Sequence, residues 1–247
     1  MLIVAREFKI FIYKNEENNI MFWSDEDKPN DYIAPDNVID LSFKLSCKQI
    51  KLDHAWMLTN AITELLPWFI DEPQAAIHHI YIPQSGNGWN RTDDFADEVI
   101  QLSRRTRLKI RIPKSRELDL QAISGKTISI DGDELTFGVS DRQLLSTITT
   151  IVARHVHIPD TDDDEEAFLH QVHKQILALG ITARKMLCGK SHYLKGNNGH
   201  IKTRSLMIAD ISPEESIILQ ENGVGDYYSY GCGIFIPQKG ITAVNDE

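Results

Sequence analysis

Alternation of apolar and polar residues predicts most of the strands in this chain. Segments in which every second residue is apolar and many are β-branched are typical of half-buried strands. Longer segments with apolar residues three or four positions apart are typical of amphipathic helices. The expected strands or strand pairs cover residues 3–13, 19–23, 37–46, 75–83, 102–113, 126–139, 148–159, 184–194, 200–211 and 233–239. The expected helices cover residues 52–68, 115–124, 163–180 and 212–223.

Local signals mark where several of the helices begin and end. Asp53 is expected to cap the first helix and Pro67 to end it. Ser212 is expected to cap the last helix, with Glu215 three residues later completing a capping box. Gly180 ends the third helix, since glycine readily takes the left-handed conformation that follows a helix. These signals separate the helices cleanly from the strands around them.

The order of the expected elements repeats once along the chain. From residue 37 onward, β-α-β-β-α-β occurs twice, which is the ferredoxin-like split motif. We therefore expect an α+β fold of two tandem ferredoxin-like (RRM-like) halves, at residues 37–140 and 147–247, with a C-terminal Gly-rich loop. The first two strands are expected to form an N-terminal β-hairpin extension over residues 1–36.

Charge is distributed unevenly along the sequence. The formal net charge is -10, which taken alone argues against nucleic acid, because phosphate binding needs Lys and Arg. Residues 101–116 nevertheless hold seven basic side chains and residues 184–204 six more, with no acid in either window. Acidic residues gather elsewhere, above all at 161–166. We expect a basic track on an acidic body.

The sequence carries no sign of export, membrane insertion or structural metal. No apolar run reaches the roughly 18 residues of a membrane span, and the first residues lack the apolar centre of a signal peptide. Cys47, Cys188 and Cys232 are too far apart for a C-x-x-C metal site and too few for a disulfide framework. We expect a cytoplasmic protein with no membrane partner and no cofactor.

The Gly-rich segment 223–235 follows a helix and precedes a strand. A dinucleotide fingerprint needs the reverse order, and the GKS at 189–191 is no P-loop because Arg184 replaces its first glycine. The glycines either serve turn geometry alone or let backbone N–H groups approach an extended polyanion. In the second case nearby tyrosines could stack on bases. These residues are Gly223, Gly225, Gly231, Gly233, Tyr227, Tyr228 and Tyr230.

Basic residues alternate with apolar ones along the strand expected at 102–113. Alternation sends Arg105, Arg107, Lys109 and Arg111 to one face, with neighbours about 6.7 Å apart. That face is either a solvated sheet face or a track for the phosphates of single-stranded or hairpin RNA.

Histidines are the candidates for proton transfer. His54 lies in the expected first turn of the helix at 52–68, where the helix dipole favours a neutral ring and free N–H groups can receive a phosphate. His78, beside His79, lies on the strand that returns from this helix. Each could equally be a hydrogen-bonded structural histidine. The pairs at 155 and 157 and at 170 and 173 are weak metal-site candidates, since no third ligand is evident.

Several of these segments together resemble a known family. They are LDHAWMLTNAITELLPW, IHHI, LSRRTRLKIRIP and the closing EESIILQENGVGDYYSYGCGIFIPQKG. Over roughly residues 38 to 241 the chain resembles the CRISPR-associated repeat-RNA endoribonucleases, the Cas-six (Cas6) family, in particular its MYXAN-type branch. The resemblance implies paired ferredoxin-like halves and metal-independent cleavage of the precursor transcript within each repeat, leaving a 2′,3′-cyclic phosphate and a 5′-hydroxyl.

The resemblance also implies roles for particular residues. The family's catalytic histidine falls on His54, with His78 as second candidate, and its Gly-rich loop falls on the four glycines of 223–233. The expected partners are CRISPR repeat RNA, as a stem-loop or single-stranded precursor, and other subunits of a type I effector complex. The expected RNA contacts are Arg104, Arg105, Arg107, Lys109, Arg111, Lys185, Lys190, His192, Lys202, Arg204, Gly223, Gly225, Tyr227, Tyr228, Gly231 and Gly233.

Three functions remain open at this point. The first is an endoribonuclease that cuts the repeat and retains the guide RNA. The second is a non-cleaving RNA-binding subunit of an effector complex. The third is a nucleotide-binding regulatory module, which would not need the basic strand face.

Overall fold

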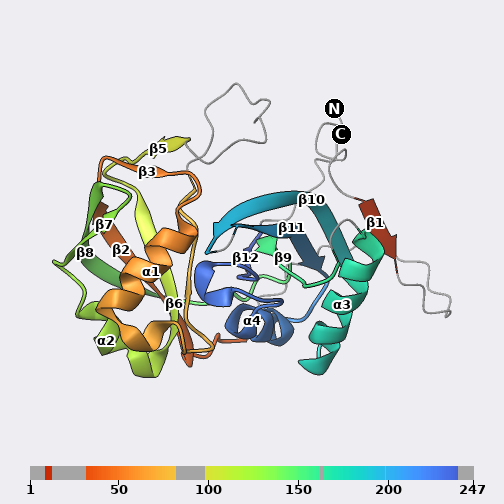
Figure 1. Ribbon diagram of the computed structural model, residues 1–247. Coiled ribbons are helices and arrows are strands. Elements are labelled where there is room, and N and C mark those ends of the chain that lie inside the picture. Colours follow the sequence, from red (N-terminus) through yellow and green to blue (C-terminus); the bar gives the residue numbers. More distant parts are fainter. Residues whose placement is uncertain (1–8, 13–31, 82–97, 162–163, 198, 239–247) are drawn as a thin grey trace, which may run out of the picture.

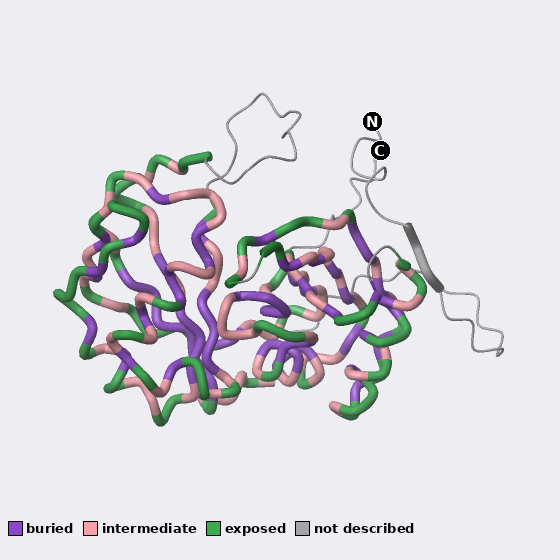
Figure 2. Tube along the Cα trace, in the orientation of Figure 1, coloured by how far each residue is buried: buried purple, intermediate pink, exposed green. Residues whose placement is uncertain are grey.

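The computed structural model describes residues 9–12, 32–81, 98–161, 164–197 and 199–238 of the 247-residue chain (Figure 1). These residues form two α+β halves that lie side by side. The backbone is buried along the central strands of each half and where the halves meet (Figure 2). The predicted second strand of the N-terminal hairpin, 19–23, lies outside the described residues.

The first half is a five-stranded antiparallel sheet with helices on one face. Its strand order, β4-β6-β2-β8-β7, is that of a ferredoxin-like sheet extended by one hairpin strand. Leu41 and Phe43 of β2 and Ile110 of β6 form the core with Leu58 and Ile62 of α1. The elements are β2 (Val38–Ser46), β3 (Gln49–Lys51), α1 (Ala55–Leu65), η1 (Pro67–Phe69), β4 (Ala76–Ile77), β5 (Val99–Gln101), β6 (Arg107–Pro113), η2 (Lys114–Arg116), α2 (Glu117–Gln121), β7 (Thr127–Ile130) and β8 (Asp133–Leu144).

The second half repeats this plan. Its sheet order is β1-β10-β11-β9-β12, and the buried stripe of α3, Leu169, Val172 and Ile176, packs on it as predicted. The predicted capping box at Ser212 and Glu215 is present at the start of α4. The elements are β9 (Ile151–Val156), α3 (Glu165–Ala178), β10 (Lys185–Gly196), β11 (Gly199–Ala209), α4 (Pro213–Asn222), η3 (Tyr228–Tyr230) and β12 (Ile236–Pro237). Two ferredoxin-like halves are therefore confirmed.

An N-terminal strand belongs to the sheet of the second half. β1 (Lys9–Ile12) pairs antiparallel with β10, and Lys9 lies opposite Cys188. β1 thereby covers the outer edge of β10, which would otherwise present unpaired backbone groups. The extension predicted for residues 1–36 thus contributes its described strand to the sheet formed by the last third of the chain.

Several predicted element boundaries are wrong, and two of them lie beside the junction between the halves. The first helix begins at Ala55 with His54 at its N-cap, and Asp53 does not cap it. The Asp53 carboxylate instead accepts the backbone N–H of Lys195, at the tip of the β10–β11 hairpin. The strand predicted for 75–83 is confined to β4, because only Ala76 and Ile77 pair with β6. Residues 78–81 run on without regular structure between the two halves.

A buried ion pair joins the halves beneath this segment. Arg111 of β6, 1% exposed, donates from Nε to Oδ1 of Asp40 (2.8 Å) and from Nη2 to its Oδ2 (3.2 Å). Its Nη1 donates across the junction to the carbonyls of Gln220 (2.8 Å) and Phe235 (3.1 Å). Burial raises the pKa of Asp40, but Arg111 and His78 lower it more, so the carboxylate stays ionised. The predicted RNA contact of Arg111 is therefore wrong.

The Gly-rich loop lies between α4 and β12, next to α1 (Figure 1). All four of its predicted glycines have positive φ, from 66° to 85°. A Cβ on Gly231 would lie 2.6 Å from the Ile77 carbonyl oxygen, and one on Gly225 would overlap the His157 carbonyl. Only glycine fits such close backbone approaches.

The four glycine N–H groups are all used within the protein. Gly223 donates to the Leu219 carbonyl and Gly231 to that of Tyr228. Gly225 donates to the side chain of Gln175 and Gly233 to the carbonyl of His155. These partners do not support the prediction that Gly223, Gly225, Gly231 and Gly233 receive phosphate on these groups. The glycines shape a loop that holds the two halves together.

We predict that Arg111→Met lowers the free energy of unfolding by about 3 to 5 kcal/mol, because it leaves the buried Asp40 carboxylate without its main partner. Urea denaturation followed by circular dichroism measures the change. The matched control is Arg105→Met, on an exposed side chain, which should change stability by no more than about 0.5 kcal/mol. Equal effects of the two substitutions would contradict the structural role of Arg111.

We predict that Gly233→Ala is far more destabilising than Gly180→Ala. Both glycines have φ in the left-handed region, 71° and 79°, so both substitutions carry a backbone cost of about 1 to 2 kcal/mol. Only at Gly233 would the new Cβ also overlap the Val224 carbonyl, whereas Gly180 has nothing within 4 Å. Thermal unfolding of the two variants measures the effect of the overlap, because the backbone cost is common to both. Equal melting temperatures of the two variants would refute the prediction.

Candidate active site

Three histidines and a tyrosine gather where the halves meet. The ring of His79, from the 78–81 segment, stacks on that of His155 of β9, with centroids 4.8 Å apart and planes at 21°. His192 of β10 meets His155 edge-on at 5.7 Å. Tyr81 lies parallel to His79 at 6.0 Å and is 44% exposed. The group reaches from the junction to solvent, since His192 is also exposed.

Hydrogen bonds fix the orientation of these rings. His155 Nε2 lies 2.9 Å from the Tyr81 hydroxyl, and Nδ1 lies 3.1 Å from Oγ1 of Thr203 on β11. His79 donates from Nε2 to the Tyr230 carbonyl in the Gly-rich loop (3.1 Å). Strands of the second half, the 78–81 segment of the first half and the Gly-rich loop therefore position the cluster together.

Two of the rings, those of His79 and His155, are kept neutral by their surroundings. Burial lowers the pKa of His79 to about 3, with repulsion from the neighbouring histidines and Arg154 adding to it. Burial also lowers the pKa of His155 well below 6.5, again helped by His79, His192 and Arg154. Neutral imidazole is the form that accepts a proton, so His155 is available as a base at neutral pH.

His54 is not part of this cluster's exposed surface. It is 1% exposed, its Nδ1 lies 2.9 Å from the Lys51 carbonyl, and its Nε2 accepts the backbone N–H of Ile80 at 3.0 Å. Burial lowers its pKa. Both ring nitrogens are thus occupied in tying the start of α1 to the 78–81 segment. These contacts favour the structural alternative for His54 and do not support its predicted catalytic role.

His78 faces the other side of the same segment. Its Nε2 lies 3.2 Å from Oδ1 of Asp40, next to the buried Arg111 pair. Burial lowers its pKa, and Asp40 partly offsets this. Its side chain is 12% exposed, so the predicted catalytic contact of His78 with substrate is not supported by its position.

Aromatic rings line the junction beside the cluster. Trp56 of α1 stacks on Tyr230 with centroids 4.1 Å apart and planes at 8°. Tyr227 is 40% exposed, contacts Trp56 edge-on and His157 in a tilted arrangement, and has a strained left-handed backbone with φ of 62°. The Tyr228 hydroxyl instead donates to the Gln220 carbonyl, so the predicted RNA contact of Tyr228 is not supported. Tyr227 is the ring best placed to meet a base.

The predicted basic face of β6 is shorter than alternation suggested. Arg104 and Arg105 are exposed in a turn before the strand, so Arg105 does not follow its alternation. Arg107 and Lys109 are half-buried, and the His78 N–H donates to the Lys109 carbonyl. The remaining basic residues of β6 therefore border the 78–81 segment.

The second basic window divides between two faces of the β10–β11 hairpin. His192 and Thr203 are paired and face the cluster, whereas Lys202 and Arg204 alternate with Thr203 and lie on the opposite face. Lys190 is exposed on β10. Lys185 forms an ion pair with Asp210 at the start of the strand, roughly 23 Å along it from His192. This position does not support its predicted RNA contact.

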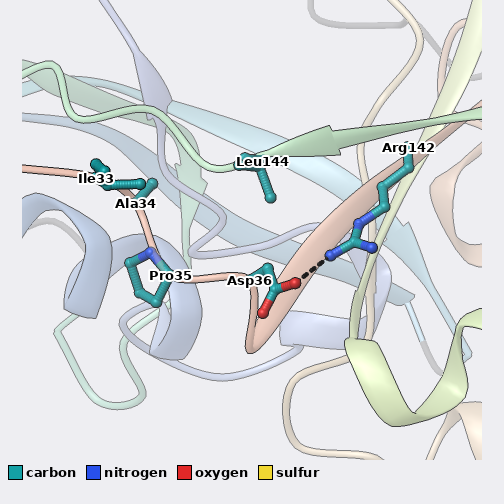
Figure 3. Close-up of a pocket in the computed structure, with 6 residues that line it drawn as sticks. All are labelled: Ile33, Ala34, Pro35, Asp36, Arg142 and Leu144. Atoms are coloured by element: carbon teal, nitrogen blue, oxygen red, sulfur yellow. Dashed lines mark hydrogen bonds and ion pairs between the residues drawn. The ribbon is translucent and has the colours of Figure 1, made fainter.

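A separate hollow lies away from the histidine cluster. An open depression of about 580 Å³ is lined by residues 33–36 and by Arg142 and Leu144 at the end of β8 (Figure 3). Its one carboxylate, Asp36, is paired with Arg142 at 2.6 Å. No histidine lines it, so we place the chemistry at the junction.

Within the described ranges, no three His, Cys, Asp or Glu side chains are arranged to hold a metal ion. Of the helices that the structure describes, none has the length and apolar character needed to cross a bilayer.

Sequence reasoning missed Tyr81, His155 and Trp56 as site residues. His155 was visible only as one of two weak histidines on a strand, and Tyr81 as the end of an apolar segment. Their proximity depends on how β9 meets the 78–81 segment across the junction. The IHHI and Gly-rich segments gave the one usable signal, because their packing brings His79 and Tyr230 together.

The neutral histidines predict acid sensitivity. Because the folded pKa of His79 lies below its unfolded value near 6.5, its contribution to stability is complete above pH 6.5 and is lost toward pH 3. We expect the free energy of unfolding to fall by about 1.4 kcal/mol per pH unit for this group below pH 6.5. Urea titrations at pH 7.0 and 5.5 test this. His79→Gln should lessen the dependence, and an unchanged slope would contradict it.

Comparison with known proteins agrees with this fold. The Cas6 family model, described as Cas6 Crispr, matches residues 39–240. A CRISPR-associated endonuclease Cas6 of Myxococcus xanthus (strain DK1622) is 25% identical over 199 residues, which cover 81% of either chain.

Two solved structures share the fold. A Cas6-related protein from Pyrococcus furiosus has a TM-score of 0.59 at 15% identity, covering 83% of this chain and all of that one. A RAMP protein described as binding different RNA substrates has a TM-score of 0.57 at 14% identity, and the match covers 81% of this chain and all of that one. Matched over most of its length, with paired ferredoxin-like halves and a Gly-rich loop between them, the chain belongs to the Cas6 family.

Proposed function

We propose that the protein is an endoribonuclease that cleaves precursor CRISPR RNA within the repeat. In this proposal the RNA's own 2′-hydroxyl attacks the adjacent phosphate, giving a 2′,3′-cyclic phosphate and a 5′-hydroxyl without metal. Family membership and the endonuclease name of the Myxococcus relative support the reaction class. The observation that carries the proposal is the cluster of neutral histidines and Tyr81 open to solvent between the halves.

The reaction needs little from the protein beyond proton transfer, charge stabilisation and alignment. A neutral imidazole accepts a proton, and a guanidinium stabilises the extra charge on the phosphate in the transition state. Arg154 of β9 lies with its guanidinium 4.1 Å from the centre of the Tyr81 ring and is exposed. Arg154 is therefore the proposed charge stabiliser. Holding the scissile nucleotide in line supplies several kcal/mol more.

RNA would reach the cluster along the exposed basic and aromatic side chains around it. Arg104, Arg105 and Lys190 offer phosphate contacts, and Tyr227 offers a ring on which an unpaired base can stack. The strained backbone of Tyr227 supports a functional role, because strain of this kind persists only where the fold enforces it. Four further basic residues, farther from the cluster, remain proposed RNA contacts: Arg107, Lys109, Lys202 and Arg204.

A second candidate function is a non-cleaving subunit that holds the repeat RNA in a type I effector complex with other subunits. The burial of His54, the expected catalytic residue, is the observation in its favour. The two functions share the same RNA-binding surface and differ only in whether the phosphate bond is cut. The nucleotide-binding alternative has no support in the site, since the Gly-rich loop uses its glycine N–H groups internally.

Cleavage of a labelled repeat RNA in EDTA tests the proposal. We expect one cut per repeat that persists in EDTA and leaves a cyclic phosphate, detected by mass spectrometry. A single 2′-deoxy substitution at the cut site should abolish the cut without weakening binding, because only the attacking hydroxyl is lost. Tight binding with no cut would establish the scaffold function instead. Neither binding nor cutting would reject both.

A further inference from the structure

The cluster contains a hydrogen-bond chain whose direction we infer from the bond that Thr203 makes to a backbone carbonyl. Thr203 donates its hydroxyl proton to the backbone carbonyl of His192 at 3.3 Å, because that carbonyl can only accept. The Thr203 oxygen is therefore free to accept, and it takes the N–H of His155 Nδ1 at 3.1 Å. In a neutral imidazole the other nitrogen then carries no proton. His155 Nε2 accordingly accepts the hydroxyl proton of Tyr81 at 2.9 Å.

This chain has the arrangement of an activated nucleophile or proton relay. An exposed hydroxyl donates to a neutral imidazole, and a third group fixes the imidazole's tautomer from behind. Tyr81 is 44% exposed, while Thr203 is buried at 1%, so the chain runs from solvent into the protein.

The charges around His155 favour its neutral form. His79 faces it from the 78–81 segment, His192 from β10, and Arg154 is its neighbour on β9. None of these groups is an anion, so nothing among them stabilises a lasting imidazolium. A proton accepted by His155 would therefore be returned readily.

We infer that Tyr81 and His155 form the proton relay that activates the attacking 2′-hydroxyl, an inference that rests on the proposed function. The 2′-hydroxyl gives its proton to the Tyr81 oxygen as Tyr81 gives its own to His155 Nε2. The bond from phosphorus to O2′ forms and the bond to O5′ breaks. The leaving 5′-oxygen takes a proton from water, and the imidazolium then neutralises the resulting hydroxide. Tyr81 is the catalytic residue here, and His155 and Thr203 act through it.

Two substitutions that preserve the shape of the side chain test the relay. Tyr81→Phe removes only the hydroxyl, and His155→Gln keeps an acceptor for Tyr81 but cannot take a proton. Under single-turnover conditions with saturating enzyme and repeat RNA, we expect each to lower the cleavage rate about 100-fold or more, with RNA affinity within about threefold of wild type. The matched control, His170→Ala on an exposed face of α3, should cleave at the wild-type rate. Melting temperatures verify that all variants fold.

The pH dependence distinguishes proton transfer from simple support. The wild-type rate should fall as His155 becomes protonated, at a pH well below 6.5, since its pKa is lowered chiefly by burial. The residual rate of His155→Gln should lack this fall. If the fall persists unchanged, His79 or His192 sets it and the relay is overturned.

A substrate with sulfur in place of the leaving 5′-oxygen tests which proton is moved. A thiolate leaves without protonation, so a defect in a general acid would be rescued on this RNA, whereas a defect in the base would persist. We expect Tyr81→Phe to remain slow, and its rescue would overturn the assignment. If the wild type cleaves and both variants, Tyr81→Phe and His155→Gln, cleave equally fast, the relay is overturned and the proposed function stands. An inactive wild type would overturn the relay together with the proposed function.

Discussion

The contact between the halves depends on one buried charge pair. Arg111 satisfies Asp40 within the first sheet and two carbonyls of the second half at the same time. A guanidinium can do this because it offers five donors in a fixed plane, whereas lysine offers a single point charge. The carbonyls belong to the end of α4 and the residue before β12, so this side chain also fixes where the Gly-rich loop begins and ends. The position of the loop then determines where His79 lies.

The site is therefore a product of assembly and belongs to neither half alone. His79 and Tyr81 come from an irregular segment of the first half, and His155, His192 and Thr203 from three strands of the second. The Gly-rich loop contacts both sets, through Tyr230 to His79 and through Gly233 to His155. Small shifts of one half against the other would separate the Tyr81 hydroxyl from its imidazole. A cleaving enzyme has reason to hold such a junction rigid.

Local chemistry made the elements predictable, and long-range contacts made the site difficult to predict. The capping box at Ser212 and the stripe on α3 depend on residues three or four apart, which a sequence displays directly. Alternation likewise identified β6, but it could not show that Arg111 would be covered by the other half. His54 has the sequence setting of a catalytic histidine and the surroundings of a structural one. Only the Ile80 N–H, 26 residues away, decides between them.

The polar junction has a consequence for how the chain emerges during synthesis. Gln220 and Phe235, which cover Arg111, are made long after the first sheet is complete. Until then the uncovered face of that sheet presents the polar side chains of Asp40, Ser42 and Arg111 to water, alongside the apolar side chains of Val38 and Ala76. A half-made protein with an apolar face would invite association with other nascent chains. Here polar side chains interrupt that face, so the first half exposes less apolar surface while its partner is being translated.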